Sequence, residues 1–367
     1  MFKFALSQES NSIPYSFKST GINIYSFEEL LYHVYHYWRE SIDEFLSNDT
    51  IKWVAEIGHS TFSADMKELR GDLAEKLLGF LALGNYFDES DILALKPQLQ
   101  KWQERREWER LKERADYFVK KGEPEKSFSL YRQALAYDEN PQVLNNLGVA
   151  LMQSNRPDEA AMHLKKAADI DSAFMENYIE AVILSGDYST AEALLQGTDF
   201  EFLRGLLAHE KKEYQQALHH YQLASNSICI YKIADVYIAL RNYSKALDVL
   251  SKISVRKAEY YVKEADVYAA WNDPKKAAAS IKRAIDISPS PGLYARLAKY
   301  LRLDYDLKAA EDVLASVSES NDDMVKLEYA RLRKAQGKLP EYQAALDELL
   351  LALKKRYREN GITPQSF

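Results

Sequence analysis

The chain has 367 residues, of which 47% are hydrophobic and 28% are charged, a balance typical of folded proteins rather than disordered ones. Its net charge of -7 at pH 7 argues against a surface built to wrap nucleic acid or to lie on anionic lipid, because both need a strongly basic face. The 13 glycines and 10 prolines fall mostly at spaced turns, which predicts a mostly helical protein.

The single cysteine suits a reducing compartment, and the short apolar runs argue against a membrane span. Cys229 cannot form an intramolecular disulfide, and its neighbours Ile228 and Ile230 predict a buried structural thiol. The longest apolar runs, such as residues 77–83, are far shorter than the roughly 20 residues that cross a bilayer. Residues 1–7 lack the apolar core of a secretory signal. The sequence therefore predicts a cytoplasmic protein with no membrane insertion.

The N-terminal part is expected to begin with extended chain and then to become helical. Residues 2–6 and 21–25 alternate weakly and are predicted to be extended. Ser26 and Glu29 have the spacing of a capping box, in which each side chain accepts the backbone amide proton of the other residue. A helix is therefore expected to begin there and to run to about residue 46.

Further helices are predicted from periodicity and capping signals. Asp49 or Thr50 is expected to cap the second helix. The charged stretch 98–121 is predicted to be one long helix that docks the N-terminal part on the rest of the chain, with Trp102 and Trp108 used for packing. The remaining predicted helices cover residues 51–57, 63–84 and 90–96.

From about residue 108 to residue 358, a small residue recurs on a helical background. Its positions are spaced by 33, 31, 26, 29, 31, 32 and 33 residues, which indicates a structural repeat. These anchor positions are Ser127, Ala160, Ala191, Ala217, Ala246, Ala277, Ala309 and Tyr342. A second, mostly small position precedes each anchor by twelve residues: Ala115, Gly148, Ile179, Gly205, Ala234, Ala265, Leu297 and Ala330. A larger residue comes four positions after each anchor: Tyr131, Leu164, Leu195, Tyr221, Leu250, Ile281, Val313 and Leu346.

This pattern resembles the tetratricopeptide repeat, a helix–turn–helix motif of about 34 residues. The resemblance implies an all-α fold: a right-handed tetratricopeptide α-solenoid of about eight helix pairs over residues 98–360, preceded by a small, mainly helical N-terminal domain over residues 1–97. The short interval after Ala191 predicts a shortened helix and a kink near residues 197–199. A last helix, 341–358, is expected to cap the array and to expose Lys354, Lys355, Arg356 and Arg358.

The opening segment carries a second resemblance. The decapeptide at residues 21–30, Gly-Ile-Asn-Ile-Tyr-Ser-Phe-Glu-Glu-Leu, and the helical layout after it are similar to the front end of uncharacterised bacterial tetratricopeptide proteins. That resemblance implies a bacterial, intracellular protein and transfers no activity.

The sequence contains none of the searched catalytic signatures: no phosphate-binding glycine loop, no nucleophile elbow, no zinc-protease helix and no paired-cysteine motif. His33 and His36 lie three residues apart, but aromatic neighbours favour packing over metal binding. His219 and His220 are adjacent and therefore diverge on a helix. We expect no catalytic residues, no metal, no cofactor and no enzymatic activity.

The tetratricopeptide resemblance implies where a partner would bind. The first helix of each pair lines the concave side, and its second, fifth, sixth, ninth and twelfth positions are available when the small residue is counted as the eighth. The subfamily that clamps a C-terminal carboxylate uses five such positions across three repeats. Lys112 and Asn146 match that pattern, whereas Asp116, Ala173 and Asn177 do not, which leaves too little positive charge for the clamp.

The remaining candidate positions predict a different groove. Asp235 and Asp266 occupy equivalent ninth positions and form, with Asp116, a recurrent acidic row. Aromatic residues that could anchor a partner fall at fifth positions, at Phe202, Tyr231 and Tyr294. The hypothesis is a groove for an extended or helical segment with basic and apolar residues. A solvated acidic face, with tyrosines covering neighbouring helices, is the alternative.

These observations favour a non-enzymatic scaffold or adaptor that binds a partner protein or peptide on the concave surface. The alternative is an intracellular regulator whose superhelix closes on a signalling peptide. DNA binding is disfavoured, because residues 51–71 carry as many acidic as basic side chains where a recognition helix would be basic. Self-association through the repeats is a third possibility, and the oligomeric state is not predicted.

Overall fold

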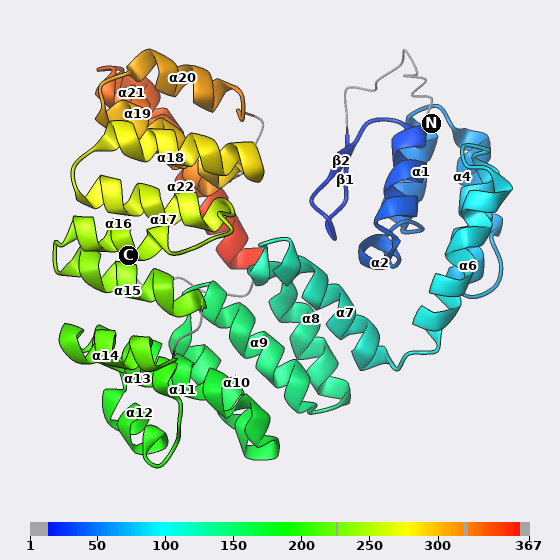
Figure 1. The fold of residues 1–367 in the computed structure, drawn as a ribbon. Helices are drawn as coiled ribbons and strands as arrows, with labels where there is room; N and C mark the ends of the chain where they lie inside the picture. The colour runs from blue at the N-terminus through cyan, green and yellow to red at the C-terminus, as the bar shows by residue number, and fades with distance from the viewer. Residues whose placement is uncertain (1–13, 225–226, 319–321, 360–367) are drawn as a thin grey trace. The chain divides into compact units, whose positions relative to one another are not determined.

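The structure of the chain is a computed structural model, and the part that it describes is helical apart from one pair of very short strands (Figure 1). It describes residues 14–224, 227–318 and 322–359. Within those ranges no helix has the length and apolar character needed to cross a bilayer. Residues 2–6, which were expected to be extended, lie outside the described part. The predicted all-α fold, with a mainly helical N-terminal part before a solenoid of helix pairs, is confirmed.

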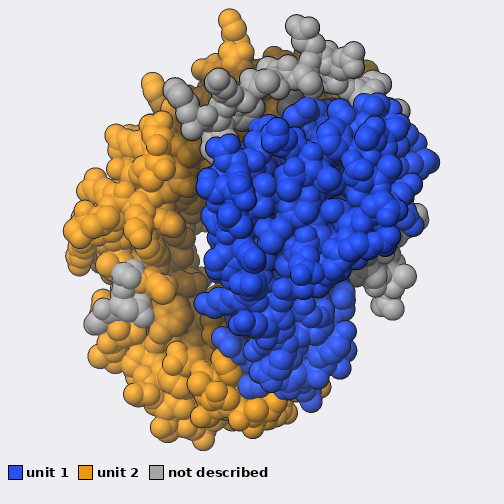
Figure 2. Space-filling model, turned by 90° about the vertical axis from the view of Figure 1, so that its right-hand side faces the viewer, with its two compact units in different colours: residues 1–150 blue, residues 151–367 orange. Residues whose placement is uncertain are grey.

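The chain divides into two compact units, residues 1–150 and residues 151–367, which Figure 2 colours separately. The first unit contains the N-terminal elements and the first helix pair, and the second contains the later pairs. Helix α9 (Pro141–Gln153) carries the border between the units. The predicted border after residue 97 falls inside a continuous helix, α6 (Glu89–Gln103), so the division into domains at 1–97 and 98–360 stays a prediction.

The N-terminal part begins with an antiparallel strand pair, β1 (Tyr15–Ser16) and β2 (Asn23–Ile24). The helices before α6 are α1 (Phe27–His36), α2 (Trp38–Ser41), α3 (Asn48–Glu56), α4 (Ser60–Glu68) and α5 (Leu73–Leu83). The predicted cap of α1 is present, since the Ser26 hydroxyl accepts the Glu29 amide proton at 3.2 Å. The Glu29 carboxylate differs from the prediction: it accepts from the Tyr25 amide, at 2.6 Å.

Several predicted helix bounds in this part are wrong, and local capping explains them. The helix expected to reach residue 46 ends at His36, and Ser47 caps the next helix in place of Asp49 or Thr50. The helix expected over 63–84 is broken, because Asp72 forms a capping box with Glu75 and starts α5 there.

The charged stretch is also two helices rather than one. Helix α6 continues through Pro97, where a stop was expected, and ends at Gln103; α7 (Glu107–Lys120) begins after a short turn. Proline in a helix costs one hydrogen bond and crowds the preceding turn, so packing must outweigh that local cost here. Trp102, near the end of α6, is buried and meets Trp38 edge-on with ring centroids 5.7 Å apart, as predicted for a packing residue.

Helix α7 ties the N-terminal helices to the first repeat, as predicted. The Nε of Arg39 donates to Oε1 of Glu113 at 3.1 Å. Arg114 forms an ion pair with Asp43 and donates to the backbone carbonyl of Glu40 at 3.2 Å. These contacts all lie within the first unit, so the N-terminal helices and α7 form one packed body.

Helices α7 to α22 succeed one another as eight helix–turn–helix pairs, numbered here repeats 1 to 8 in chain order. The predicted count of about eight pairs is therefore confirmed. The helices of repeats 1 to 4 not yet given are α8 (Pro124–Tyr137), α10 (Pro157–Ile170), α11 (Met175–Leu184), α12 (Tyr188–Leu195), α13 (Glu201–Glu210) and α14 (Tyr214–Ala224). A 3₁₀ turn, Ser172–Phe174, precedes α11. Repeats 5 to 8 comprise α15 (Ser227–Ala239), α16 (Tyr243–Ser251), α17 (Ala258–Ala270), α18 (Pro274–Ile287), α19 (Pro291–Leu303), α20 (Leu307–Ala315), α21 (Asp323–Ala335) and α22 (Leu339–Glu359).

The predicted anchors are completely buried in repeats 1 to 6. In repeat 7 the prediction is wrong by one residue. Helix α20 is capped by Asp306, and the fully buried alanine is Ala310 rather than Ala309. The two companion positions shift with it, to Ala298 and Leu314, both of which are buried. Two adjacent alanines made the registers indistinguishable in sequence, and the helix cap decides between them.

The shortened helix predicted in repeat 3 is present. Helix α12 ends at Leu195, and Gly197 comes two residues later with a φ of +72°, a left-handed conformation that favours glycine. The side chain of Arg204, from α13, donates to the carbonyls of Leu195 and Thr198 at 2.8 and 2.9 Å. A cation placed on these last carbonyls stabilises the end of a helix.

Two tyrosines at equivalent positions provide a test of this packing. The Tyr131 hydroxyl donates to Oδ1 of Asp116 at 2.6 Å, whereas the buried Tyr221 hydroxyl has no hydrogen-bond partner among the described residues. Tyr131→Phe is expected to lower the free energy of unfolding by about 1.5 kcal/mol, because it removes a bond to a charged group. Tyr221→Phe should leave stability equal or slightly higher. Urea unfolding followed by circular dichroism measures both, and equal losses would contradict the assignment.

Candidate partner-binding surface

In the first unit, three predicted site residues come together in one hydrogen-bonded network. Lys112 Nζ lies 2.8 Å from Oδ2 of Asp116, and the side-chain amide of Asn146 donates to Oδ1 of the same carboxylate at 2.9 Å. Tyr131 donates to that oxygen too, and burial together with this bond raises the pKa of the Tyr131 phenol. These groups satisfy one another, and the charge of Lys112 is neutralised by Asp116. The lack of a carboxylate clamp stays a prediction.

In the second unit, the predicted acidic residues are paired with cations. Lys263 Nζ lies 2.7 Å from Oδ1 of Asp235 and 3.9 Å from Oδ2 of Asp266. Arg296 forms an ion pair with Asp266 and donates to the Tyr300 hydroxyl at 3.3 Å. The face therefore alternates in charge, and the predicted acidic row is corrected to a ladder of ion pairs, called the charge ladder below.

The charge ladder obeys a rule of position. With repeat 7 in its corrected register, Arg296 and Lys263 are both sixth positions, and each pairs with the ninth-position aspartate of the preceding repeat. Asn146 and Asp116 in the first unit obey the same rule. This alternation of charge was visible in the sequence, since Lys263 lies three residues before Asp266 and Lys232 lies three residues before Asp235. That signal was missed because only the aspartates were compared.

The three predicted aromatic anchors differ in their surroundings. Phe202 is partly buried, with its ring centroid 5.9 Å from that of Tyr221, so it already takes part in packing within repeat 4. Tyr231 is partly exposed on α15. Tyr294 was placed at a fifth position, but the corrected register gives that position to the buried Ala295. Of the three, Tyr231 remains the best placed to meet a partner.

A hollow of about 390 Å³ lies on the face formed by the first helices of repeats 5 to 7. It brings together two predicted residues, Tyr231 and Asp266. Its lining comes from α15, from α17, from the turn before α19 and from the start of α19. The lining residues are Tyr231, Ala258, Glu259, Val262, Lys263, Asp266, Ser288, Ser290 and Leu293. We call it the α17 hollow.

The electrostatics of the α17 hollow are set by Glu259. Burial raises the pKa of the Tyr231 phenol, and the negative charge of Glu259 raises it further, which shows that the two groups lie close together. Glu259 is exposed and has no cationic partner among the described residues. Lys263 and Asp266, by contrast, belong to the charge ladder. The sequence reading missed Glu259, although it lies at the second position of its helix pair, one of the five positions considered.

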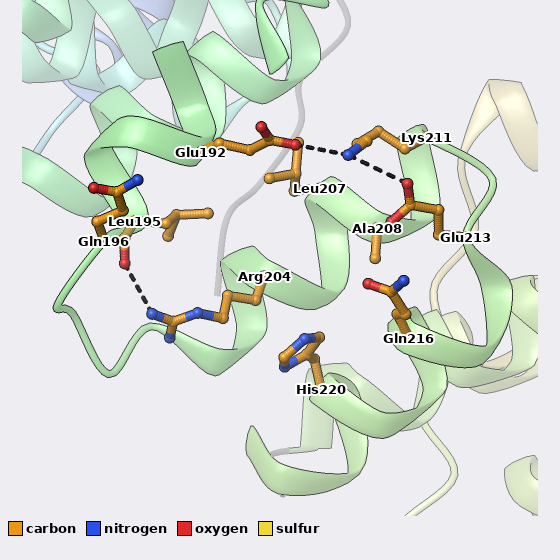
Figure 3. Close-up of a pocket in the computed structure, with 10 residues that line it drawn as sticks. All are labelled: Glu192, Leu195, Gln196, Arg204, Leu207, Ala208, Lys211, Glu213, Gln216 and His220. Atoms are coloured by element: carbon orange, nitrogen blue, oxygen red, sulfur yellow. Dashed lines mark hydrogen bonds and ion pairs between the residues drawn. The ribbon is translucent and has the colours of Figure 1, made fainter. Parts of the chain in front are cut away.

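A second hollow, of about 280 Å³, lies among α12, α13 and α14 (Figure 3). Its charged side chains are paired with one another: Lys211 Nζ lies 2.6 Å from Oε1 of Glu192 and 3.2 Å from Oε1 of Glu213. His220 Nδ1 lies 2.7 Å from Oε2 of Glu201, and Arg204 holds the end of α12. The charged groups of this hollow are therefore held by one another, and Arg204 also stabilises the end of α12.

The histidines and the cysteine of the sequence lie in structural surroundings. His33 is buried, with its ring 3.9 Å from that of Phe17 and its Nε2 3.3 Å from the Thr20 hydroxyl oxygen. Cys229 is buried in the core, as predicted. Within residues 14–224, 227–318 and 322–359, no cluster of three or more His, Cys, Asp or Glu side chains has the geometry to hold a metal ion. His209 is half-buried, and burial lowers its pKa.

The geometry defines a class: an all-helical protein built from successive helix–turn–helix repeats. Comparison with known proteins agrees. Models of the tetratricopeptide repeat match residues 112–173 and residues 258–291. The chain is a tetratricopeptide repeat protein. In this fold the repeats generally mediate binding between proteins, and the fold is typically a non-enzymatic scaffold.

Among curated proteins, none matches this sequence. Among solved structures, a tetratricopeptide repeat protein from Parabacteroides merdae is similar at 17% identity, over 69% of this chain and 98% of that one, with a TM-score of 0.38. That likeness is too loose to bear on the curvature or the partners of this chain. The similarity of the N-terminal part to bacterial proteins stays a prediction.

Proposed function

We propose that the protein is a non-enzymatic scaffold that binds a partner protein or peptide on the face of its first helices, the concave side of a tetratricopeptide superhelix. The observation that carries this proposal is the α17 hollow. It lies on that face, it contains the predicted residues Tyr231 and Asp266, and it combines apolar walls with polar groups at its rim. Sites that recognise side chains of a partner have this composition.

Because of the charge ladder, substitutions of its aspartates are a poor test of partner binding. Replacing Asp235 or Asp266 by lysine would break ion pairs with Lys263 and Arg296, and so would disturb the stacking of repeats as well as any groove. A loss of partner binding in those variants would not separate the two effects. A sharper test changes a side chain that faces the hollow and forms no ion pair between repeats.

Tyr231→Ala meets that requirement, and Tyr305→Ala is its matched control. Tyr305 lies in the turn after α19, is 89% exposed and does not line the hollow. Both variants and the parent protein would be used as baits in cell lysate, with quantitative mass spectrometry, and then in titration calorimetry with the purified partner. A central tyrosine contributes about 2 kcal/mol to an interface, so we expect Tyr231→Ala to weaken binding by roughly 30-fold.

The Tyr305→Ala control and circular dichroism spectra of all three proteins show whether a loss of binding comes from the hollow or from a change in folding. Tyr305→Ala should keep the parent affinity, and all three proteins should have the same helical content. Equal partner recovery and affinity for Tyr231→Ala and the parent would remove the hollow from the interface and contradict the proposal.

A further inference from the structure

The walls of the α17 hollow are suited to an aliphatic chain. Ala258 and Val262 contribute apolar surface from α17, Leu293 contributes it from the start of α19, and the ring of Tyr231 closes the side toward α15. Methylene groups gain by leaving water for such a surface. Ser288 and Ser290 place hydroxyl groups at the rim, where they can accept hydrogen bonds. The hollow therefore offers an apolar passage with polar acceptors at its edge.

One carboxylate in the lining of the hollow has no cationic partner among the described residues. Two acids of the charge ladder, Asp235 and Asp266, are matched by Lys263 and Arg296. Glu259 is the lining residue whose charge no cation compensates within the described residues. An anionic ligand would meet that carboxylate, while Lys263, the one cation in the lining, is held by its two aspartates. Charge complementarity thus favours a cation at the rim beside Glu259.

We propose that the α17 hollow receives a lysine or arginine side chain of the bound partner, with its methylenes along Val262 and Leu293 and its cationic end at Glu259. Long basic side chains bury their stems on apolar surface and keep the charged end at a polar rim, which is the arrangement of this hollow. The inference rests on the proposed function and specifies the partner chemistry at one position of that surface.

A small free amine is a weaker fit than a side chain. One uncompensated, exposed carboxylate gives an ion pair of little strength by itself, since water and salt screen it. A partner that is already held by the rest of the face brings the basic side chain to the hollow at high effective concentration. The hollow then selects among partners rather than supplying most of the affinity.

A disulfide-tethering experiment tests the preference without knowing the partner. Ser290 lines the hollow, is exposed and makes no side-chain cap bond at the start of α19, so Ser290→Cys places a thiol at the rim. The natural Cys229 is only 1% exposed and should not react in the folded protein. The probes are three small disulfides of matched length: cystamine, bis(2-hydroxyethyl) disulfide and dithiodipropionate. Intact-protein mass spectrometry measures equilibrium labelling against a fixed concentration of 2-mercaptoethanol.

We expect the ammonium probe to label Ser290→Cys about threefold more than the hydroxyl probe, and the carboxylate probe to label it least. Adding Glu259→Gln should abolish the preference for the ammonium. Adding Asp286→Asn, which removes an exposed carboxylate of α18 outside the lining, should leave it intact.

Three results would overturn the inference: no preference for the ammonium probe, a preference for the carboxylate probe, or an ammonium preference that survives Glu259→Gln. In any of these cases the proposed function would still be decided separately, by whether Tyr231→Ala weakens partner binding. Failure of the basic-side-chain site is therefore distinguishable from failure of the binding surface.

Discussion

Replacing Arg302 with methionine is expected to destabilise the last two repeats by about 3 kcal/mol. Arg302, near the end of α19, donates from Nε to Oε1 of Glu328 in α21 at 2.6 Å. Glu328 is only 3% exposed, so its carboxylate depends on that partner. The remaining cation, Arg331, lies 3.6 Å away and is itself 47% exposed. Removing Arg302 would leave a buried charge with weak compensation.

Hydrogen exchange of peptides from α21 and α22 measures this effect locally, which is necessary because repeat arrays need not unfold in one step. A loss of 3 kcal/mol corresponds to exchange that is roughly a hundredfold faster. Arg331→Met should change the exchange rate several-fold at most. Adding Glu328→Met to Arg302→Met should restore most of the protection. If Arg302→Met exchanged no faster than Arg331→Met, the buried ion pair would not be a determinant of stability.

The repeat could be predicted from the sequence because it depends on small residues at a fixed interval. A fully buried anchor such as Ala160 leaves little room for a larger side chain, so the requirement is visible in repeats 1 to 7. Gly205 shows the same constraint in detail: a Cβ there would lie 2.5 Å from Cδ1 of the buried Tyr221 ring. Helix ends were harder to predict, because Asp72 and Asp306 act through caps whose register one residue can change.

The candidate surface was predicted only in part, for a physical reason. Periodicity identifies which side chains share a helix face, and Lys263 lies within reach of both Asp235 and Asp266, the two residues that it grouped together. Their charge state depends on which cation of the next repeat lies within reach, and that depends on how the helices stack. Arg296 entered the charge ladder only when the register of repeat 7 was known. Glu259, by contrast, is distinguished by having no partner, a property that no pattern of residue types reveals.

The stability of the first unit is expected to fall as the pH drops below about 6.5, and His33 is a main cause. The pKa of His33 is lowered to about 4, chiefly by burial; the negative charge of Glu44 opposes this shift and the positive charge of Lys121 adds to it. In the unfolded chain, histidine keeps a pKa near 6.5. Between these values the unfolded state binds a proton that the folded state does not, so the free energy of unfolding decreases as the pH falls. From pH 7 to pH 5 the His33 contribution amounts to about 2 kcal/mol.

His33→Phe isolates that contribution, because the new ring can still stack on Phe17 and carries no titratable group. Tryptophan fluorescence in urea reports mainly on the first unit, which contains all the tryptophans except Trp271. Between pH 7 and pH 5 the parent protein should lose about 2 kcal/mol more than His33→Phe does, whereas His219→Gln, at an exposed position, should behave like the parent. Above pH 6.5 the parent should instead be the more stable of the two proteins, because it keeps the Thr20 contact that phenylalanine lacks. Parallel pH profiles for the parent and His33→Phe would show that His33 protonates equally in both states, and that its burial does not control the acid sensitivity of this unit.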